Sequence, residues 1–237
     1  MAKGNASKVK SGTAGQVRII GGQFRRQMVP FIDAEGLRPS PDRLRETLFN
    51  WIQFDLHDAK VLDLCAGSGV LGFESLSRGA SWVDFIELQA NQVNMIAKTA
   101  EKLKLSTDRY RVSAGDALQV IPSLANSIVH RSENVHRSQN AHQSINVYQS
   151  KEDTPSNAIS PYPYHIVYID PPYDLDLWVP MINQLIEHNL VNSESLLYIE
   201  DRRILSETLQ QLPYSYLTLK ETKIGQIFAS LIQIKLD

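Results

Sequence analysis

The sequence is poor in cysteine and has no long apolar run. Cys65 is the single cysteine among 237 residues, so an intramolecular disulfide cannot form. No stretch of about 18 consecutive apolar residues is present, which argues against a membrane-spanning helix, and residues 1–15 lack the apolar core of a secretory signal. We therefore expect a cytoplasmic protein that makes no membrane contact. The sequence also lacks the cysteine and histidine spacing of a zinc site, and we expect no metal.

An excess of charge of one sign is missing as well, because 24 Lys and Arg residues oppose 26 Asp and Glu residues. The positive charge is nevertheless concentrated near the start, where no acidic residue precedes Asp33. The basic residues of this front end are Lys3, Lys8, Lys10, Arg18, Arg25, Arg26, Arg38, Arg43 and Arg45. Local potential steers phosphate more than net charge does, so the pattern favours an anionic partner at one edge. For the first three lysines, a solvated tail is the simpler interpretation.

The composition divides the chain into three parts. Residues 1–16 are rich in Gly, Ser, Lys and Asn without periodicity, which predicts a disordered basic leader. Residues 17–58 predict a small β/α extension, with a short hairpin around Gly21 and Gly22 followed by an amphipathic helix over 42–51. Residues 59–237 make up the main domain.

In the main domain, the pattern alternates between strands and helices. We expect strands at 61–64, 82–87, 110–113, 165–170, 195–200, 215–221 and 226–234. We expect helices at 70–78, 93–103, 117–124 and 177–188. This alternation predicts the α/β class, with a mostly parallel seven-stranded sheet and helices on both faces. The last two strands have no helix between them, so they predict an antiparallel hairpin at one edge of the sheet.

A polar segment, residues 126–163, interrupts this alternation. It is dense in Ser, Asn, Gln and His, and an insert of this length and composition is typical of disorder. The regular spacing of His130, His136 and His142 leaves a metal site conceivable. Polar tracts of this kind gather histidine without binding a metal, and the segment holds no cysteine, so we favour disorder.

A glycine-rich turn follows the first strand of the main domain, in the segment Val61–Gly69. Gly67 and Gly69 allow a nucleotide-like ligand to approach the main chain at the carboxyl end of the strand. Glu87 ends the next strand, at the spacing where an acidic side chain meets ribose hydroxyls. A dinucleotide is the alternative ligand, but Asp63 would repel its pyrophosphate. S-adenosylmethionine, which carries an ammonium, a sulfonium and a ribose diol, suits these acidic residues better.

A third acidic residue, Asp116, follows the third strand. There it could accept a hydrogen bond from an adenine amino group, or it could serve only as a helix cap. Acidic residues after three successive strands together favour the cofactor site over three unrelated caps.

The segment Asp170–Tyr173 follows the fourth strand, so it lies at the same edge as the glycine turn. Its two prolines fix the backbone and have no N–H group, so the local backbone offers acceptors only. The Asp170 carboxylate and the Pro171 carbonyl could accept the two hydrogens of an exocyclic amino group, while Tyr173 stacks on the ring. The segment therefore predicts a receptor for a planar base whose amino nitrogen is methylated.

Leu62–Gly69 followed by Asp170–Tyr173 resembles the Rossmann-like amino-methyltransferases that use S-adenosylmethionine. Further motifs are similar to the bacterial family that methylates N2 of a guanine in 16S ribosomal RNA, namely Arg18–Gly22, Arg38–Trp51, Leu71–Ala80 and Lys223–Ile227. The resemblance extends over nearly all of Val17–Lys235, apart from the polar insert. The family usually has Thr where this chain has Ser40.

The resemblance implies a Rossmann-like class I methyltransferase fold and methylation of the exocyclic N2 of a guanine. Catalysis is assigned to Asp170, Pro171 and Tyr173. Cofactor binding is assigned to Asp63, Ala66, Gly67, Ser68, Gly69, Glu87, Leu88, Asp116 and Ala117. RNA binding is assigned to Arg18, Arg25, Arg26, Arg38, Arg43 and Arg45. The implied partner is 16S rRNA within the small ribosomal subunit or an assembly intermediate, and we expect a monomer.

Two other functions are compatible with parts of the sequence. A DNA adenine-N6 methyltransferase uses a similar segment after base flipping, but it requires a target-recognition domain, for which we expect this chain to be too short. A non-catalytic RNA-binding assembly factor would be expected to have lost the acidic residues, and all are present. Cys65 could suggest a cytosine-C5 mechanism, but its place at the exit of the first strand favours a small packed residue.

Overall fold

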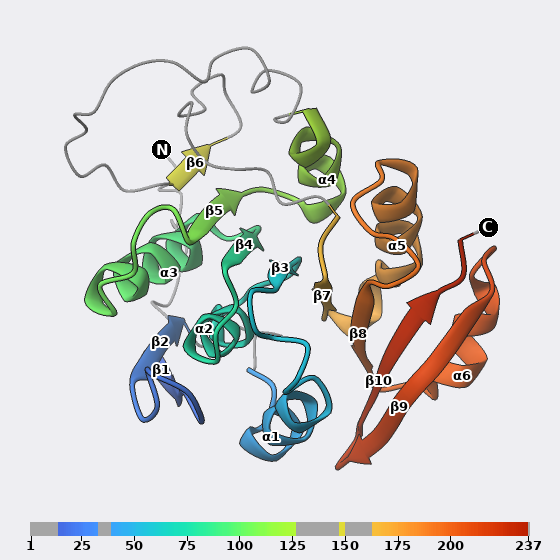
Figure 1. Ribbon diagram of the computed structural model, residues 1–237, viewed down its shortest axis with the longest axis horizontal. Coiled ribbons are helices and arrows are strands. Elements are labelled where there is room, and N and C mark those ends of the chain that lie inside the picture. The colour runs from blue at the N-terminus through green and yellow to red at the C-terminus, as the bar shows by residue number, and fades with distance from the viewer. Residues whose placement is uncertain (1–13, 33–38, 127–146, 150–162, 237) are drawn as a thin grey trace, which may run out of the picture.

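The computed structural model describes residues 14–32, 39–126, 147–149 and 163–236. Its largest element is an eight-stranded sheet in the order β6-β5-β4-β3-β7-β8-β10-β9 (Figure 1). The strands are β3 (Lys60–Asp63), β4 (Trp82–Glu87), β5 (Tyr110–Ala114), β6 (Val147–Gln149), β7 (Ile166–Ile169), β8 (Leu196–Asp201), β9 (Tyr216–Ile224) and β10 (Ile227–Ile234). Neighbouring strands from β6 to β8 are parallel, whereas β10 is antiparallel to both β8 and β9.

Seven of these strands and the antiparallel hairpin confirm the fold predicted from the sequence. The eighth strand, β6, corrects it, because β6 lies inside the segment 126–163 that we expected to be disordered. It pairs with β5, which would otherwise form the open edge of the sheet. The three histidines of the conceivable metal site, His130, His136 and His142, lie outside the described residues.

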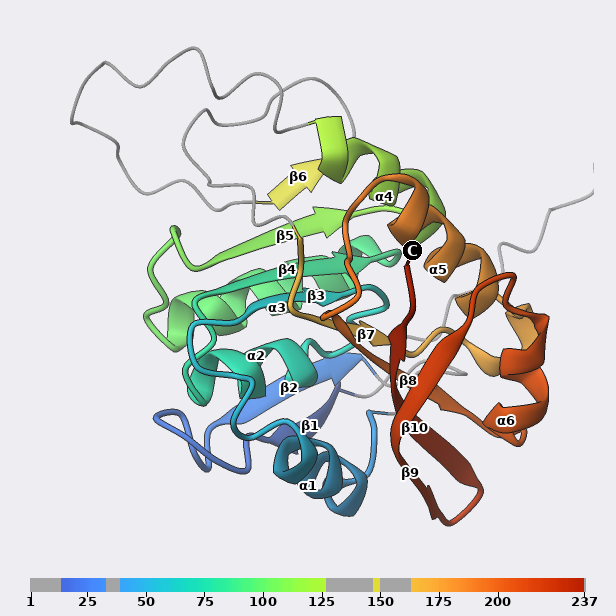
Figure 2. The same ribbon diagram turned by 45° about the vertical axis from the view of Figure 1, so that its right-hand side comes forward.

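Helices cover both faces of the sheet (Figure 2). One face carries α1 (Asp42–Trp51), α2 (Val70–Ser77) and α3 (Ala90–Lys102), and the other carries α4 (Ala117–Asn126), α5 (Trp178–Glu187) and the short α6 (Leu205–Thr208). Along β7, Ile166 and Tyr168 join the apolar cluster of the first face, and Val167 and Ile169 join that of the second. This division is expected for a central strand that is buried on both sides. Within the described residues, no helix is both long enough and apolar enough to cross a membrane.

The front end forms a separate antiparallel pair, β1 (Ala14–Arg18) and β2 (Met28–Ile32). Its first strand begins at Ala14, so the predicted boundary of the leader at residue 16 is placed too late. Residues 14–16 pair with 30–32 across the hairpin, and such pairing is not visible in local composition. The pair packs beside α3, where the Ile32 N–H donates to Gln92 Oε1 at 2.9 Å. The extension is thereby fixed to the main domain.

Candidate active site

The carboxyl ends of the parallel strands meet at one edge of the sheet, where the strand order reverses between β3 and β7. Ligands of doubly wound sheets bind in the crevice at such a point. Cys65 lies there, and burial raises the pKa of its thiol. The charges that raise this pKa further come from Asp170, Asp63, Glu87 and Asp116. The structure therefore gathers all four carboxylates that the sequence assigned to cofactor and base. The raised pKa keeps the thiol protonated, which agrees with a packed cysteine and not with a nucleophile.

The glycine turn is a tight connection between β3 and α2. Gly67 and Gly69 have φ angles of 51° and 75°, in the left-handed region that favours glycine. A Cβ atom at Gly69 would lie 3.1 Å from the Phe73 ring, so a side chain has little room there. The other predicted turn residues, Ala66 and Ser68, are buried. The backbone of this turn can therefore approach a ligand closely.

Asp63 is a buried carboxylate at the end of β3, with 3% of its surface exposed. Its Oδ2 accepts the Gly72 N–H at 3.2 Å. Burial raises the pKa of Asp63 to about 7, and the charge of Glu87 adds to this effect. Among the described residues, no lysine, arginine or histidine forms an ion pair with it. A buried carboxylate without a cationic partner suits a cationic ligand.

Glu87 connects the end of β4 to the glycine turn. One of its oxygens accepts the Gly67 N–H and the other accepts the Gln89 N–H, both at 2.8 Å. Burial raises the pKa of Glu87, although these hydrogen bonds oppose the shift. Leu88, the next residue, is apolar and 68% exposed. Leu88 therefore presents apolar surface next to Glu87.

Asp116 lies at the start of α4, where its Oδ1 accepts the Leu118 N–H at 2.8 Å. It therefore has the capping role that the sequence left open. The cap does not exclude a ligand. It uses only Oδ1 of Asp116, and Oδ2 forms no hydrogen bond with the described residues. Ala117, the next predicted cofactor residue, is buried in the first turn of the helix.

The segment Asp170–Tyr173 leaves β7 at the same edge. Burial raises the pKa of Asp170 well above its usual range, and the charges of Glu200 and Asp63 add to it. Pro171 is buried, and Tyr173 begins the 3-10 helix η1 (Tyr173–Leu175). The structure thus brings the three predicted catalytic residues to the edge that holds the cofactor residues.

The outer side of this segment is held by arginines. The Arg202 guanidinium lies 5.2 Å from the centre of the Tyr173 ring. Arg203 forms ion pairs with Asp201, at 2.7 Å, and with Asp176. A surface depression here is lined by Tyr173, Asp174, Asp176, Asp201, Arg202 and Arg203. The depression opens beside the ring that is expected to stack on the base.

Glu200 is a buried acidic residue that the sequence analysis assigned only to a strand. Its Oε1 accepts hydrogen bonds from Ser40 Oγ at 2.7 Å and from the Tyr198 hydroxyl at 2.9 Å. Burial raises the pKa of Glu200, while these two donors and the charge of Arg45 oppose the shift. The sequence signal for it was present. Glu200 lies near the carboxyl end of a parallel strand, as do the other carboxylates that were predicted to meet at this edge.

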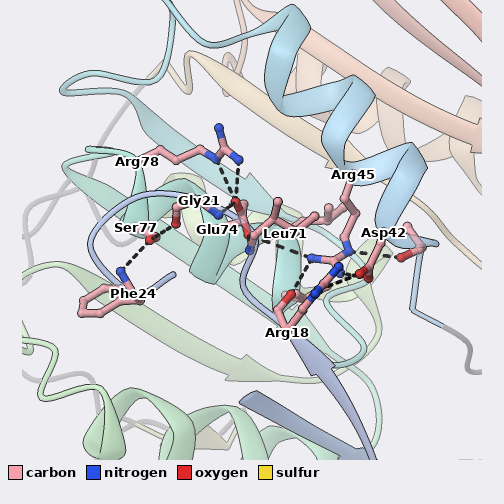
Figure 3. A network of polar contacts seen from close by, with 12 residues as sticks. Arg18, Gly21, Phe24, Asp42, Arg45, Leu71, Glu74, Ser77 and Arg78 are labelled. Carbon is pink, nitrogen blue, oxygen red and sulfur yellow. Dashed lines mark hydrogen bonds and ion pairs between the residues drawn. The ribbon is translucent and has the colours of Figure 1, made fainter. Parts of the chain in front are cut away.

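The front end docks on α2 through buried polar contacts (Figure 3). Glu74 accepts the N–H groups of Ile20 and Gly21, both at 2.7 Å, and binds Arg78 at 2.8 Å. Next to them, Gly22 has a φ of 72°, and a Cβ atom there would lie 1.9 Å from the Ser77 carbonyl oxygen. The glycine pair is therefore required by close packing on α2 as well as by the turn.

Arg45 corrects the predicted set of RNA contacts, because its side chain is 0% exposed. It donates to the carbonyl oxygens of Ser40 at 3.2 Å and Arg18 at 2.9 Å, and to Asp42 at 2.6 Å (Figure 3). All these partners lie within the extension or at the start of α1. Arg45 thus holds the extension together and cannot reach RNA without leaving this network.

The other predicted RNA contacts have different surroundings. Arg25, Arg26 and Arg43 are exposed. Arg18 is also exposed, and its guanidinium pairs with Asp42 at 2.9 Å. Arg38 lies outside the described residues. The described front end therefore presents four arginine side chains to solvent.

The fold and the residues at this edge define a Rossmann-like class I methyltransferase. A solved structure from Escherichia coli, described as a putative methyltransferase, has a TM-score of 0.67 at 29% identity and covers 94% of this chain and 100% of that chain. A second, a putative methylase from Haemophilus influenzae, has a TM-score of 0.63 at 29% identity and covers 92% of this chain and 98% of that chain.

The family follows from sequence comparison. The model of the family described as conserved hypothetical protein 95 matches residues 17–131 and 119–233. Several relatives carry the name Ribosomal RNA small subunit methyltransferase D. The Haemophilus influenzae protein is 31% identical over 92% of this chain and 94% of its own length, and the Escherichia coli protein is 34% identical over 93% and 91%. The chain belongs to this family, which confirms the resemblance of its motifs.

The residues at this edge fit S-adenosylmethionine as the cofactor. Asp63 offers a buried negative charge for a cationic group, and Glu87 offers carboxylate oxygens for a ribose diol. The glycine turn lets the ligand lie against the backbone, and Leu88 offers apolar surface for the adenine. These residues thus match the cationic group, the diol and the base of this cofactor.

Proposed function

We propose that the chain transfers a methyl group from S-adenosylmethionine to the exocyclic N2 of a guanine in small-subunit ribosomal RNA. The observation that carries the proposal is the segment Asp170–Tyr173, where a carboxylate with a raised pKa, a buried proline and an aromatic ring lie beside the cofactor residues. The relatives named for small-subunit ribosomal RNA support this substrate.

The chemistry requires the amino nitrogen to be positioned and then deprotonated. When bound, S-adenosylmethionine supplies the methyl group. Asp170 and the Pro171 carbonyl accept the two amino hydrogens, which directs the nitrogen lone pair toward the methyl carbon. Tyr173 stacks on the guanine and holds its plane. The amino nitrogen would accept the methyl group that the bound cofactor supplies, and Asp170 would take one amino proton. A carboxylate with a raised pKa is the better acceptor for that proton.

The exposed front-end arginines are the proposed RNA contacts. Arg18, Arg25, Arg26 and Arg43 supply positive charge at the surface of the front end. Arg38 is included in the proposal on its sequence position alone. Phosphate contacts of this kind position the substrate without reading its sequence. We infer that the chain works as a monomer on 16S rRNA within the small subunit or an assembly intermediate.

The test is the transfer of labelled methyl to three substrates in parallel: undermethylated small ribosomal subunits, naked 16S rRNA and duplex DNA. Nucleosides are then separated and identified. N2-methylguanosine from the ribosomal substrates is the expected product. N6-methyladenine in DNA would replace the proposal with the DNA methyltransferase, and tight cofactor binding without transfer would replace it with the assembly factor.

A further inference from the structure

Glu200 is a buried carboxylate for which the reaction described above has no role. Its side chain lies in the core with 1% of its surface exposed. Ser40 and Tyr198 both donate to Oε1, whereas Oε2 is buried and has no hydrogen-bond partner within the described residues. Buried polar atoms are nearly always paired, so an unpaired carboxylate oxygen requires an explanation. A ligand with a hydrogen-bond donor would supply the missing partner.

Glu200 lies beside the segment that is proposed to bind the target base. The parallel register of β7 and β8 aligns Ile169 with Ile199, so the residues that follow them, Asp170 and Glu200, are neighbours at the carboxyl ends of these strands. Burial raises the pKa values of Asp170 and Tyr173, and the charge of Glu200 adds to both shifts, which agrees with a carboxylate in their neighbourhood. Glu200 is therefore a neighbour of two residues that are proposed to hold the base, Asp170 and Tyr173.

We propose that Glu200 is a specificity-determining residue that accepts the N1–H of the target guanine while Asp170 holds the N2 amino group. This inference rests on the proposed function. Guanine presents N1–H and N2–H as adjacent, nearly parallel donors, whereas adenine presents an acceptor at N1 beside its amino group. An ionised carboxylate can only accept. It stabilises guanine and repels the N1 lone pair of adenine, so one side chain selects the base.

The surroundings of Glu200 hold the carboxylate in place for this role. The hydroxyls of Ser40 and Tyr198 donate to Oε1, which fixes the orientation and leaves Oε2 free for the base. Burial raises the pKa of Glu200, and these two hydrogen bonds oppose that shift because they favour the charged form. A protonated Oε2 would instead donate and would select an acceptor at N1. The two protonation states therefore predict opposite base preferences, which an experiment can distinguish.

The test compares guanine with 2-aminopurine at the methylated position of 16S rRNA reconstituted into small subunits. The position is first mapped with the wild-type chain. 2-Aminopurine keeps the amino group at C2, but its N1 is an acceptor and it lacks O6. Glu200→Gln keeps the length of the side chain, and Ser40 and Tyr198 keep its carbonyl oxygen at Oε1. The amide N–H then points where Oε2 was, so it donates to the N1 of 2-aminopurine.

The quantity measured is kcat/KM for methyl transfer on each substrate. Wild type is expected to prefer guanine, and Glu200→Gln is expected to lower kcat/KM on guanine by about 10- to 100-fold and to shift the guanine to 2-aminopurine ratio by at least about tenfold. The missing O6 affects both proteins alike, so the change in the ratio isolates the contact of Glu200 with N1. Glu187→Gln, an exposed change at the end of α5, should leave the ratio at the wild-type value.

The possible outcomes separate the inference from the proposed function. Equal ratios in wild type and Glu200→Gln would overturn the inference, and so would a wild type that prefers 2-aminopurine. Binding of S-adenosylhomocysteine shows whether the variant is folded. If Glu200→Gln does not fold, Glu200→Asp is measured instead, because it withdraws the carboxylate by one methylene. Its rate on guanine is expected to be lower than that of wild type by about tenfold or more. A wild-type rate would overturn the inference. A wild type that forms no N2-methylguanosine would instead refute the proposed function.

Discussion

The affinity of the chain for its cofactor is expected to rise with pH because of Asp63. Burial raises the pKa of this carboxyl to about 7, so the ligand-free protein holds its proton in part at neutral pH. Only the ionised form attracts a cationic group of the cofactor. The ionised fraction increases from about one-tenth at pH 6 to about nine-tenths at pH 8. The affinity should therefore increase about tenfold over this range and level off above it.

The assay is isothermal titration calorimetry with S-adenosylhomocysteine, which keeps the ammonium group, at pH 6, 7 and 8. In buffers of different ionisation enthalpy, binding at pH 6 should release close to one proton for each ligand bound. Asp63→Asn should bind more weakly and with an affinity that is nearly constant over the same range, because an amide does not titrate. An equally steep pH dependence in Asp63→Asn would refute the reasoning and assign the proton to Glu87, whose pKa burial also raises.

The same proton affects the stability of the ligand-free chain. The pKa of Asp63 is higher in the folded state, about 7, than the ordinary value of 3.8. The stability that this proton contributes is therefore complete below pH 3.8 and is lost as the pH rises through 7. Asp63→Asn avoids the buried charge. Its gain in free energy of unfolding should be about 1 kcal/mol larger at pH 8 than at pH 6, as measured by denaturant titration.

Three other changes test the site and the extension. Asp170→Asn should lower kcat for methyl transfer by about 100-fold or more while leaving calorimetric binding of S-adenosylhomocysteine intact, and loss of binding would make Asp170 structural. Charge reversal of Arg25 and Arg26 should weaken binding to small-subunit RNA and flatten its salt dependence, and an unchanged salt slope would remove both from the interface. Gly22→Ala should lower the free energy of unfolding by about 3 kcal/mol, because it adds a clash to the cost of positive φ. Gly225→Ala, with a φ of 62° and open space around it, should cost only about 1 kcal/mol, and equal losses would refute the clash.

The acidic residues at the sheet edge could be predicted from the sequence because the rule behind them uses chain order alone. Parallel strands joined by helices end at the same edge, so a carboxylate that follows each strand joins the others. Asp63, Glu87 and Asp170 follow this rule. The rule gives no contacts, so it could not tell that Asp116 caps a helix while it also borders the crevice.

Burial within the extension could not be predicted, because it depends on contacts between distant residues. The local sequence around Arg45 and Arg43 is similar, yet Arg45 is buried and Arg43 is exposed. The difference arises because Arg45 faces the end of β1, where it binds the Arg18 carbonyl. The sequence does not predict β6 for a similar reason. The strand lies inside the polar insert, and it pairs with β5, which is distant in the sequence.

Ser40 joins the extension to the edge of the sheet that holds the site. Its hydroxyl donates to Glu200 across 160 positions of sequence, and its carbonyl accepts from Arg45, which also binds the end of β1. The part of the chain that carries the exposed arginines is therefore connected to the carboxylate beside Asp170. The contact with Glu200 requires only a hydroxyl that donates. The family usually has Thr at position 40, and a threonine hydroxyl supplies the same donor, so this departure from the family pattern keeps the chemistry of the contact.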